Sequence, residues 1–133
     1  MGALSGYKII ELSGIGPGPL CGMLLSDLGA EVIRIDRKHT AMPQSDPRFD
    51  ITGRNKKSIC LNLKDDASKE IFFKLIKDAD ALIEGFRPGV TEKLGIGPDD
   101  CLKINPKLVY GRITGWGQDG PLSQAAGHDI NYI

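Results

Sequence analysis

The sequence has no long apolar run and no excess of either charge. Its 133 residues include 17 lysines and arginines against 17 aspartates and glutamates, so no overall field favours nucleic acid or an anionic membrane. No segment approaches the roughly 18 apolar residues of a membrane-spanning helix. Residues 1–6 lack the basic and apolar regions of a secretory signal. We therefore expect a protein that is not secreted and has neither nucleic acid nor a membrane as a partner.

Cysteine is scarce, and the common metal and nucleophile motifs are missing. The three cysteines, Cys21, Cys60 and Cys101, form no C-x-x-C pair, and each lies within an apolar pattern. We interpret them as reduced, buried side chains rather than as a disulfide framework or metal ligands. The sequence contains neither H-E-x-x-H nor G-x-S-x-G, so we expect no metal site and no serine nucleophile of the hydrolase type.

Short apolar strands alternate with helical segments along most of the chain. Strands are predicted at residues 8–12, 31–35, 58–63, 81–83 and 108–113. Helices are predicted from Pro19 to a stop at Gly29, after Asp65, over residues 90–94, and from Gly97 to Asn105. This alternation favours an α/β fold with a Rossmann-like, doubly wound parallel sheet. Residues 1–133 are too few for two ordinary domains.

The first loop is similar to a dinucleotide-binding fingerprint but departs from it at a critical position. Gly14 and Gly16 follow the first strand, and Asp36 lies about 20 residues further on, as in that motif. The third glycine position holds Pro19, however, and both Pro17 and Pro19 lack the N–H group that a pyrophosphate needs at a helix N-terminus. We therefore exclude a dinucleotide site of this type.

Basic residues follow several of the predicted strands. Arg37 follows the second strand and Arg87 the fourth, while Lys64 and Lys93 lie near other element ends. Because the carboxyl ends of parallel strands meet at one edge of a sheet, these residues are expected to face one ligand site. Arginine donates two parallel hydrogen bonds to phosphate, which indicates a phosphorylated ligand; ordinary surface charge is the alternative. His39 lies in the polar connection after Arg37, and we assign it no role.

The other histidine, His128, stands in a Gly-His-Asp triplet after a glycine-rich turn. A histidine side chain can accept and return a proton near neutral pH, as a reaction at an acidic carbon requires. The alternative is a histidine that caps or packs the start of a helix. Asp129 is adjacent in sequence and cannot face His128 on a helix. We therefore interpret Asp129 as a residue that caps the helix or bonds a backbone amide rather than as the partner of His128.

Several blocks, in one order along the chain, resemble the N-terminal portion of α-methylacyl-CoA racemases in the family III CoA-transferase superfamily. The blocks cover residues 11–19, 32–37, 61–64, 84–90, 115–121 and 127–132. The resemblance implies a larger, interlocked homodimer fold. Residues 1–133 would then be the incomplete N-terminal part of its CoA-binding α/β domain, with the catalytic remainder and a second domain beyond this sequence.

The resemblance also implies a reaction, in which the R and S forms of 2-methyl-branched acyl-CoA thioesters interconvert through an enolate. By position, His128 matches a catalytic acid/base. Lys93 stands where relatives are expected to carry arginine, and Asn62 where they often carry aspartate. The positions matching residues that line the CoA site are Ile15, Arg37, Leu61, Asn62, Leu63, Lys64, Gly85, Phe86, Arg87, Lys93, Gly127, His128, Asp129, Ile130, Asn131 and Tyr132.

Inversion at the α-carbon needs a second acid/base on the opposite face. The resemblance places it at an aspartate beyond Ile133, so we expect this chain alone to be inactive or nearly so. No cofactor is implied beyond the CoA moiety of the acyl-CoA substrate. The implied compartment is the cytoplasm of a bacterium, or the mitochondria or peroxisomes of a eukaryote.

Two alternatives stay open. A CoA transferase of the same superfamily uses an aspartate nucleophile and generally lacks a histidine at the position of His128. A non-catalytic CoA-binding or assembly fragment would keep the ligand site without proton transfer.

Overall fold

A five-stranded sheet forms the centre of the computed structural model, which describes residues 2–37 and 47–133. The spatial order is β3-β2-β1-β4-β5, and every neighbouring pair runs parallel. The strand order changes direction between β1 and β4, so a ligand crevice is expected beyond the carboxyl ends of these two strands. The strands are β1 (Lys8–Leu12), β2 (Glu31–Asp36), β3 (Lys57–Cys60), β4 (Ala81–Glu84) and β5 (Val109–Arg112).

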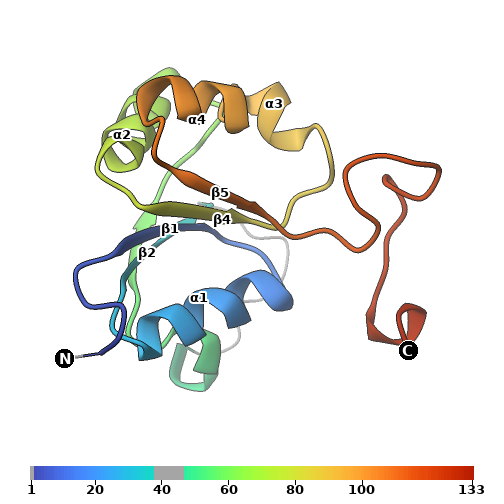
Figure 1. The fold of residues 1–133 in the computed structure, drawn as a ribbon, viewed down its shortest axis with the longest axis horizontal. Helices are drawn as coiled ribbons and strands as arrows, with labels where there is room; N and C mark the ends of the chain where they lie inside the picture. The colour runs from blue at the N-terminus through green and yellow to red at the C-terminus, as the bar shows by residue number, and fades with distance from the viewer. Residues whose placement is uncertain (1, 38–46) are drawn as a thin grey trace.

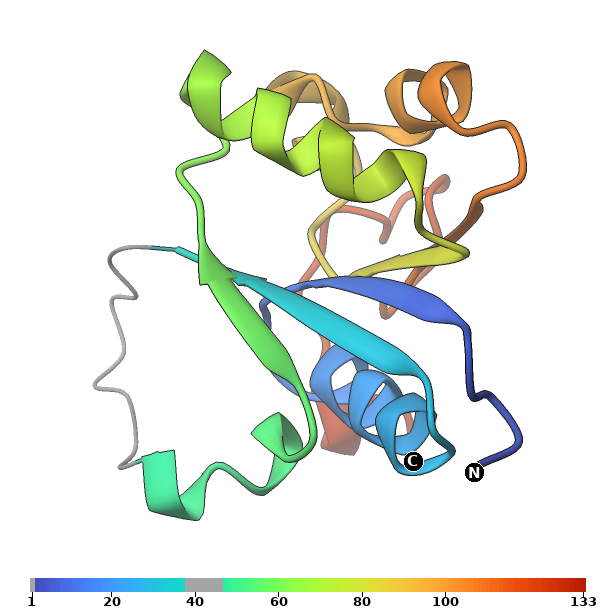
Figure 2. The same cartoon turned by 90° about the vertical axis from the view of Figure 1, so that its left-hand side faces the viewer.

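Helices cover both faces of the sheet, which confirms the doubly wound α/β fold predicted from the sequence (Figure 1). One face carries α1 (Pro17–Asp27) and the 3₁₀ turns η1 (Pro47–Phe49) and η2 (Ile51–Gly53) (Figure 2). The other carries α2 (Asp66–Lys77), α3 (Val90–Leu94) and α4 (Pro98–Ile104). After β5 the chain leaves both layers and ends with the turn η3 (Asp129–Asn131), which stands apart from the sheet in Figure 1.

The first helix begins two residues before its predicted start, at Pro17 rather than Pro19. Gly16 has φ 72°, a left-handed conformation that ends the loop. Pro17 then occupies the first helical position, where its missing N–H costs no hydrogen bond. The predicted stop is confirmed, because Gly29 follows the helix with φ 100°.

The third strand is shorter than predicted and ends at Cys60 rather than at Leu63. A turn replaces its expected end, with the N–H of Asp65 donating to the carbonyl of Asn62 at 2.8 Å. The turn brings the residues after β3 to the edge where the strands end. The polar connection before this strand includes His39, which lies outside the described residues.

The buried apolar side chains divide into a cluster on each face of the sheet. On the α2 and α4 side, Ile10, Phe72, Ile76, Leu82 and Ile96 are all fully buried. The smaller cluster beneath α1 contains Ile9, Ala30, Val32 and Ile83. Successive strand residues point to opposite faces, so the two clusters together bury both sides of β1 and β4.

The interpretation of all three cysteines as buried is wrong for Cys60, which is exposed, and only half right for Cys21, which is half-buried. Cys60 ends the edge strand β3, where Ile59 alone among the strand residues is partly covered. Cys101 is fully buried as predicted. Burial raises the pKa of the Cys101 thiol to about 12, so it is no nucleophile at neutral pH.

A buried ion pair lies between the sheet and α1. Glu11 of β1 is fully buried, and its Oε2 lies 2.6 Å from Nζ of Lys56, whose side chain is 2% exposed. The same ammonium donates to the carbonyl of Pro19 at 2.9 Å, which ties the first turn of α1 to the sheet. The second oxygen, Oε1, is buried without a hydrogen-bond partner among the described residues. Gly22 of α1 passes directly over the carboxylate.

Replacing Gly22 with alanine is expected to destabilise the fold by roughly 1–3 kcal/mol, the usual cost of overpacking a buried site. A Cβ at Gly22 would lie 1.9 Å from Oε2 of Glu11, so the ion pair would have to move. Gly18→Ala is the matched control in the same helix, because a Cβ there meets nothing within 4 Å. Urea denaturation should show a lower midpoint for Gly22→Ala only. Equal midpoints for the two variants would contradict the predicted close approach.

Candidate functional site

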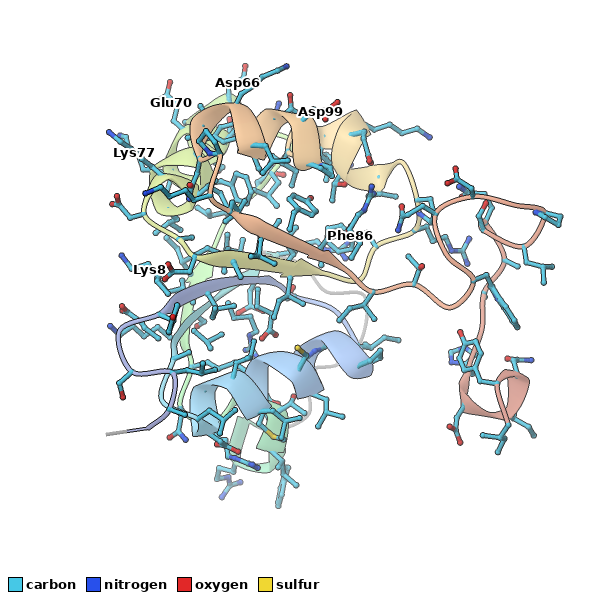
Figure 3. The ribbon with its side chains drawn as sticks, viewed as in Figure 1. Lys8, Asp66, Glu70, Lys77, Phe86 and Asp99 are labelled. Atoms are coloured by element: carbon cyan, nitrogen blue, oxygen red, sulfur yellow. The ribbon has the colours of Figure 1, made fainter. Side chains whose placement is uncertain are left out.

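Two adjoining pockets lie where the carboxyl ends of the strands meet the loops that follow them. Their volumes are about 800 and 590 Å³, and Phe86 lines both. Phe86 follows β4 by two residues and lies on the side of the sheet that α3 and α4 cover (Figure 3). Its ring is therefore a shared wall between the two spaces.

The larger pocket is formed by the start of α1, the loop after β4 and the segment after β5. His128 and Arg87 both line it, so the structure brings the candidate acid/base and one predicted cation into the same space. The residues predicted from the sequence that line this pocket are Ile15, Gly85, Phe86, Arg87, Gly127, His128, Asp129 and Tyr132. Ile130 and Asn131 line neither pocket, and Ile130 is 80% exposed.

The smaller pocket is lined by most of the other predicted residues, including three cations from separate elements. These are Arg37 after β2, Lys64 after β3 and Lys93 on α3. The predicted residues that line this pocket are Arg37, Leu61, Asn62, Leu63, Lys64, Phe86 and Lys93. The expectation that the basic residues face one site is therefore met in part, because Arg87 lines the larger pocket instead.

Sequence reasoning missed the apolar lining of the smaller pocket. Leu12, Ile35, Val90 and Leu94 also line it, together with two further polar residues that were not predicted, Ser13 and Asp36. Leu12 and Ile35 lie at the carboxyl ends of β1 and β2, so the position of ligand sites in parallel sheets was a signal that could have found them. Val90 and Leu94 gave no such signal, because their place on a short helix is equally typical of core residues.

Arg37 and Phe86 contact one another across the boundary between the pockets. The guanidinium carbon of Arg37 lies 5.3 Å from the centroid of the Phe86 ring, a cation–π contact. The contact holds the arginine against an apolar wall while its N–H groups remain available to a ligand. Next to it, the N–H of Lys64 donates to Oδ1 of Asn62 at 3.3 Å, which shapes the turn after β3.

The segment that carries His128 is closed by an aromatic contact. The rings of Tyr132 and Trp116 lie 5.2 Å apart. The Tyr132 hydroxyl sits against Gly115 and Gly127, where an added Cβ would lie 2.0 Å and 2.1 Å away, respectively. Gln124 donates to the carbonyl of Pro88 at 3.2 Å and connects this segment to the loop after β4. The glycines around His128 are therefore required by close packing.

His128 is exposed to solvent and occupies the N-cap position of the η3 turn, so it lies at the start of a helical turn, as the capping alternative predicted. It precedes the η3 turn, where its N–H donates to Oδ1 of Asn131 and its carbonyl accepts from the N–H of Asn131, both at 2.8 Å. The capping role predicted for Asp129 is wrong, because His128 occupies the N-cap position and Asp129 is the first residue of the turn. The other interpretation, that Asp129 bonds a backbone amide, stays a prediction. His128 is one of the residues that line the larger pocket.

The described part of the chain holds no cluster of three or more His, Cys, Asp or Glu side chains that could bind a metal ion. None of the helices in residues 2–37 and 47–133 combines the length and apolarity that a bilayer-spanning helix needs. The polar side chains that line the two pockets belong to four cations, one histidine, two aspartates, one asparagine and four hydroxyl residues, namely Arg37, Lys64, Arg87, Lys93, His128, Asp36, Asp129, Asn62, Ser13, Thr114, Ser123 and Tyr132.

Known proteins are similar to this chain in sequence and in fold. The chain is 46% identical over 133 residues to human alpha-methylacyl-CoA racemase, covering 98% of this chain and 33% of the racemase. It is 38% identical over 137 residues to acetyl-CoA:oxalate CoA-transferase from Acetobacter aceti, covering 96% and 35%. The crystal structure of a Mycobacterium tuberculosis protein matches with a TM-score of 0.88 at 36% identity, covering 98% of this chain and 38% of that one.

The chain spans about a third of the length of these curated relatives, which include both a racemase and a transferase. CoA-transferase family III matches residues 4–133, nearly the whole sequence. This chain therefore belongs to CoA-transferase family III.

Proposed function

We propose that the chain is the N-terminal part of an acyl-CoA racemase that interconverts the R and S forms of 2-methyl-branched thioesters. One observation carries the proposal: the exposed residue His128 lines a pocket that shares Phe86 with a second pocket, which is lined by three cations. This arrangement suits a long ligand with an anionic end and a reactive end. The identity to a human racemase supports the same reading.

In this proposal the nucleotide and phosphate groups of CoA lie in the smaller pocket. Its aliphatic walls accept a flat base, and Arg37, Lys64 and Lys93 bind phosphate oxygens. Lys93 offers a point charge without the bidentate fork of an arginine. The pantetheine arm passes Gly85 and Phe86 and brings the thioester into the larger pocket.

At the thioester, the carbonyl group makes the neighbouring C–H acidic, and neutral His128 removes that proton from one face. The enolate oxygen needs hydrogen-bond donors aimed at it. The amide of His128 already donates to Asn131, so the donor must be another group of this pocket. A proton returned from the opposite face completes inversion, and we assign that step to an aspartate beyond Ile133 in a homodimeric protein. Residues 1–133 alone are expected to have little or no activity.

The second candidate function is CoA transfer, favoured by the similarity to acetyl-CoA:oxalate CoA-transferase. The two reactions differ in whether the α-hydrogen of the acyl-CoA is replaced by deuterium from the solvent. A racemase exchanges the α-hydrogen of a 2-methylacyl-CoA for deuterium in D₂O and needs no carboxylic acid as a CoA acceptor. A transferase moves CoA to an added carboxylic acid and leaves the α-hydrogen in place. The assay uses the longer protein of which we propose this chain to be a part. CoA transfer without α-hydrogen exchange would reject the racemase proposal.

Replacing Arg37 with alanine is expected to weaken CoA binding about 10- to 100-fold, since a hydrogen bond to a charged group contributes about 1.5–3 kcal/mol. Arg54→Ala is the matched control: this arginine pairs with Asp27 on the α1 side and lines neither pocket. Calorimetric titration with CoA at fixed ionic strength measures the CoA affinity of both variants. Equal affinities for the two variants would remove Arg37 from the proposed site.

A further inference from the structure

A second charge network is built on the buried carboxylate of Glu84 and is bonded to the backbone of Phe86, the residue that lines both pockets. Glu84, the last residue of β4, is 1% exposed. Its Oε2 accepts the backbone N–H of Phe86 at 2.7 Å, and its Oε1 accepts Nε of Arg112 at 2.9 Å. Both oxygens of the carboxylate are therefore occupied, one by the loop that carries the pocket wall and one by the neighbouring strand.

The guanidinium of Arg112 extends the network from the sheet to α3. It binds Glu92 with two hydrogen-bonding groups, NH1 at 2.8 Å from Oε1 and NH2 at 3.2 Å from Oε2. Burial opposes the charge, yet Glu92 and Glu84 raise the pKa of Arg112 above its ordinary value. One side chain of β5 thus joins β4 to the helix that carries Lys93.

The network contacts the ligand pockets only through other residues. Glu84 and Arg112 line neither pocket, whereas Phe86 lines both and Lys93 lines the smaller one. Burying a carboxylate and a guanidinium is costly, and an apolar pair of the same size would fill the space at lower cost. The charged pair differs from an apolar pair because its hydrogen bonds are directional. They fix the positions of the Phe86 backbone amide and the Glu92 carboxylate.

We propose that Glu84 and Arg112 are positioning residues. They hold Phe86 and α3 at a fixed position relative to one another, so that one ligand can occupy both pockets at once. This inference rests on the proposed CoA-thioester function. Its consequence is specific to a ligand that spans the wall. Either half of CoA needs only one pocket, whereas intact CoA needs both pockets at a fixed separation.

The test compares three ligands, namely CoA, adenosine 3′,5′-bisphosphate and pantetheine, in Glu84→Gln and in the unmodified protein. Glutamine keeps the size of the side chain but offers one acceptor oxygen for two donors, so one of the two hydrogen bonds is lost. We expect the affinity for CoA to fall about tenfold more than the affinity for either half, because linked binding depends on matching the span. Calorimetric titration gives all three affinities.

Two further variants make the result decisive. Arg112→Lys keeps the charge but cannot bridge Glu84 and Glu92 with a planar fork, and it should reproduce the pattern if Glu84→Gln does not fold. Asp80→Asn is the control: its carboxylate accepts the N–H of Lys8 at 2.8 Å at the opposite end of β4, so all three affinities should be unchanged.

Equal losses for CoA and for both halves, or no loss for CoA, would overturn the positioning role and leave the proposed function standing. If the unmodified protein binds no CoA, the proposed function and this inference fail together. A larger loss for intact CoA than for its halves supports the inference.

Discussion

Replacing His128 with alanine is expected to slow exchange of the α-hydrogen by roughly 10²–10⁴-fold, the usual contribution of a general acid/base. CoA affinity should change little, because the cations of the smaller pocket are untouched. The fold should also be preserved, since the His128 side chain is exposed and its backbone is held by Asn131. The measurement is deuterium incorporation into a 2-methylacyl-CoA by the longer protein.

The matched control is Leu122→Ala, a change in the same segment at a half-exposed side chain that lines neither pocket. It should retain the original rate. Unchanged exchange in the His128→Ala variant, with CoA still bound, would favour the reading of a non-catalytic CoA-binding fragment. A loss of CoA affinity as large as the loss of rate would instead indicate a binding role for the imidazole.

Replacing Lys56 with methionine is expected to destabilise the chain by roughly 3–5 kcal/mol, because it leaves the Glu11 carboxylate charged, buried and unpaired. Lys57→Met is a matched control one residue away: its partner is Glu31, and its side chain is 72% exposed. An exposed pair contributes at most about 1 kcal/mol. The free energies of unfolding in urea measure the difference. The double variant Glu11→Met with Lys56→Met should recover most of the stability, since it removes both buried charges.

The same pair predicts how stability depends on pH. Burial raises the pKa of the Glu11 carboxyl above its ordinary value, and the hydrogen bond from Lys56 partly offsets this rise. Because the Glu11 carboxyl has a higher pKa in the folded state than in the unfolded chain, its protonation stabilises the fold at pH values below its ordinary pKa. This stabilisation is lost as the pH rises through the folded-state pKa. The deficit of Lys56→Met should therefore be smaller near pH 5 than near pH 8. An equal deficit at both values would exclude Glu11 as its cause.

The alternation of strands and helices could be predicted from the sequence because it rests on local interactions. The spacing of apolar residues identifies the strand 8–12 and the helix over 90–94, which the structure gives as Lys8–Leu12 and Val90–Leu94. Glycine and proline mark the ends of elements through their own backbone restrictions, as at Gly29. Errors of a few residues at Pro19 and Leu63 arose where a turn competed with the regular pattern.

The sequence also indicated the candidate residues for binding and proton transfer, since histidine and arginine have distinctive charge and hydrogen bonding whatever their surroundings. Only the tertiary structure decided how they are grouped. Arg37 and Arg87 looked equivalent in the sequence, yet they line different pockets on either side of Phe86. Their separation depends on the positions of two loops in space, which no local pattern specifies.

The two buried charge networks were equally absent from the sequence reasoning. Glu11 and Lys56 are 45 residues apart, and Glu84 and Arg112 are 28 apart, so each pair forms only after the parallel strands have assembled. A charged residue in a sequence is normally read as exposed, because burying it alone is so costly. The partner that makes burial possible is supplied by chain topology. This is why the sequence determined the elements and indicated the candidate residues, whereas the fold decided which of those residues lie together.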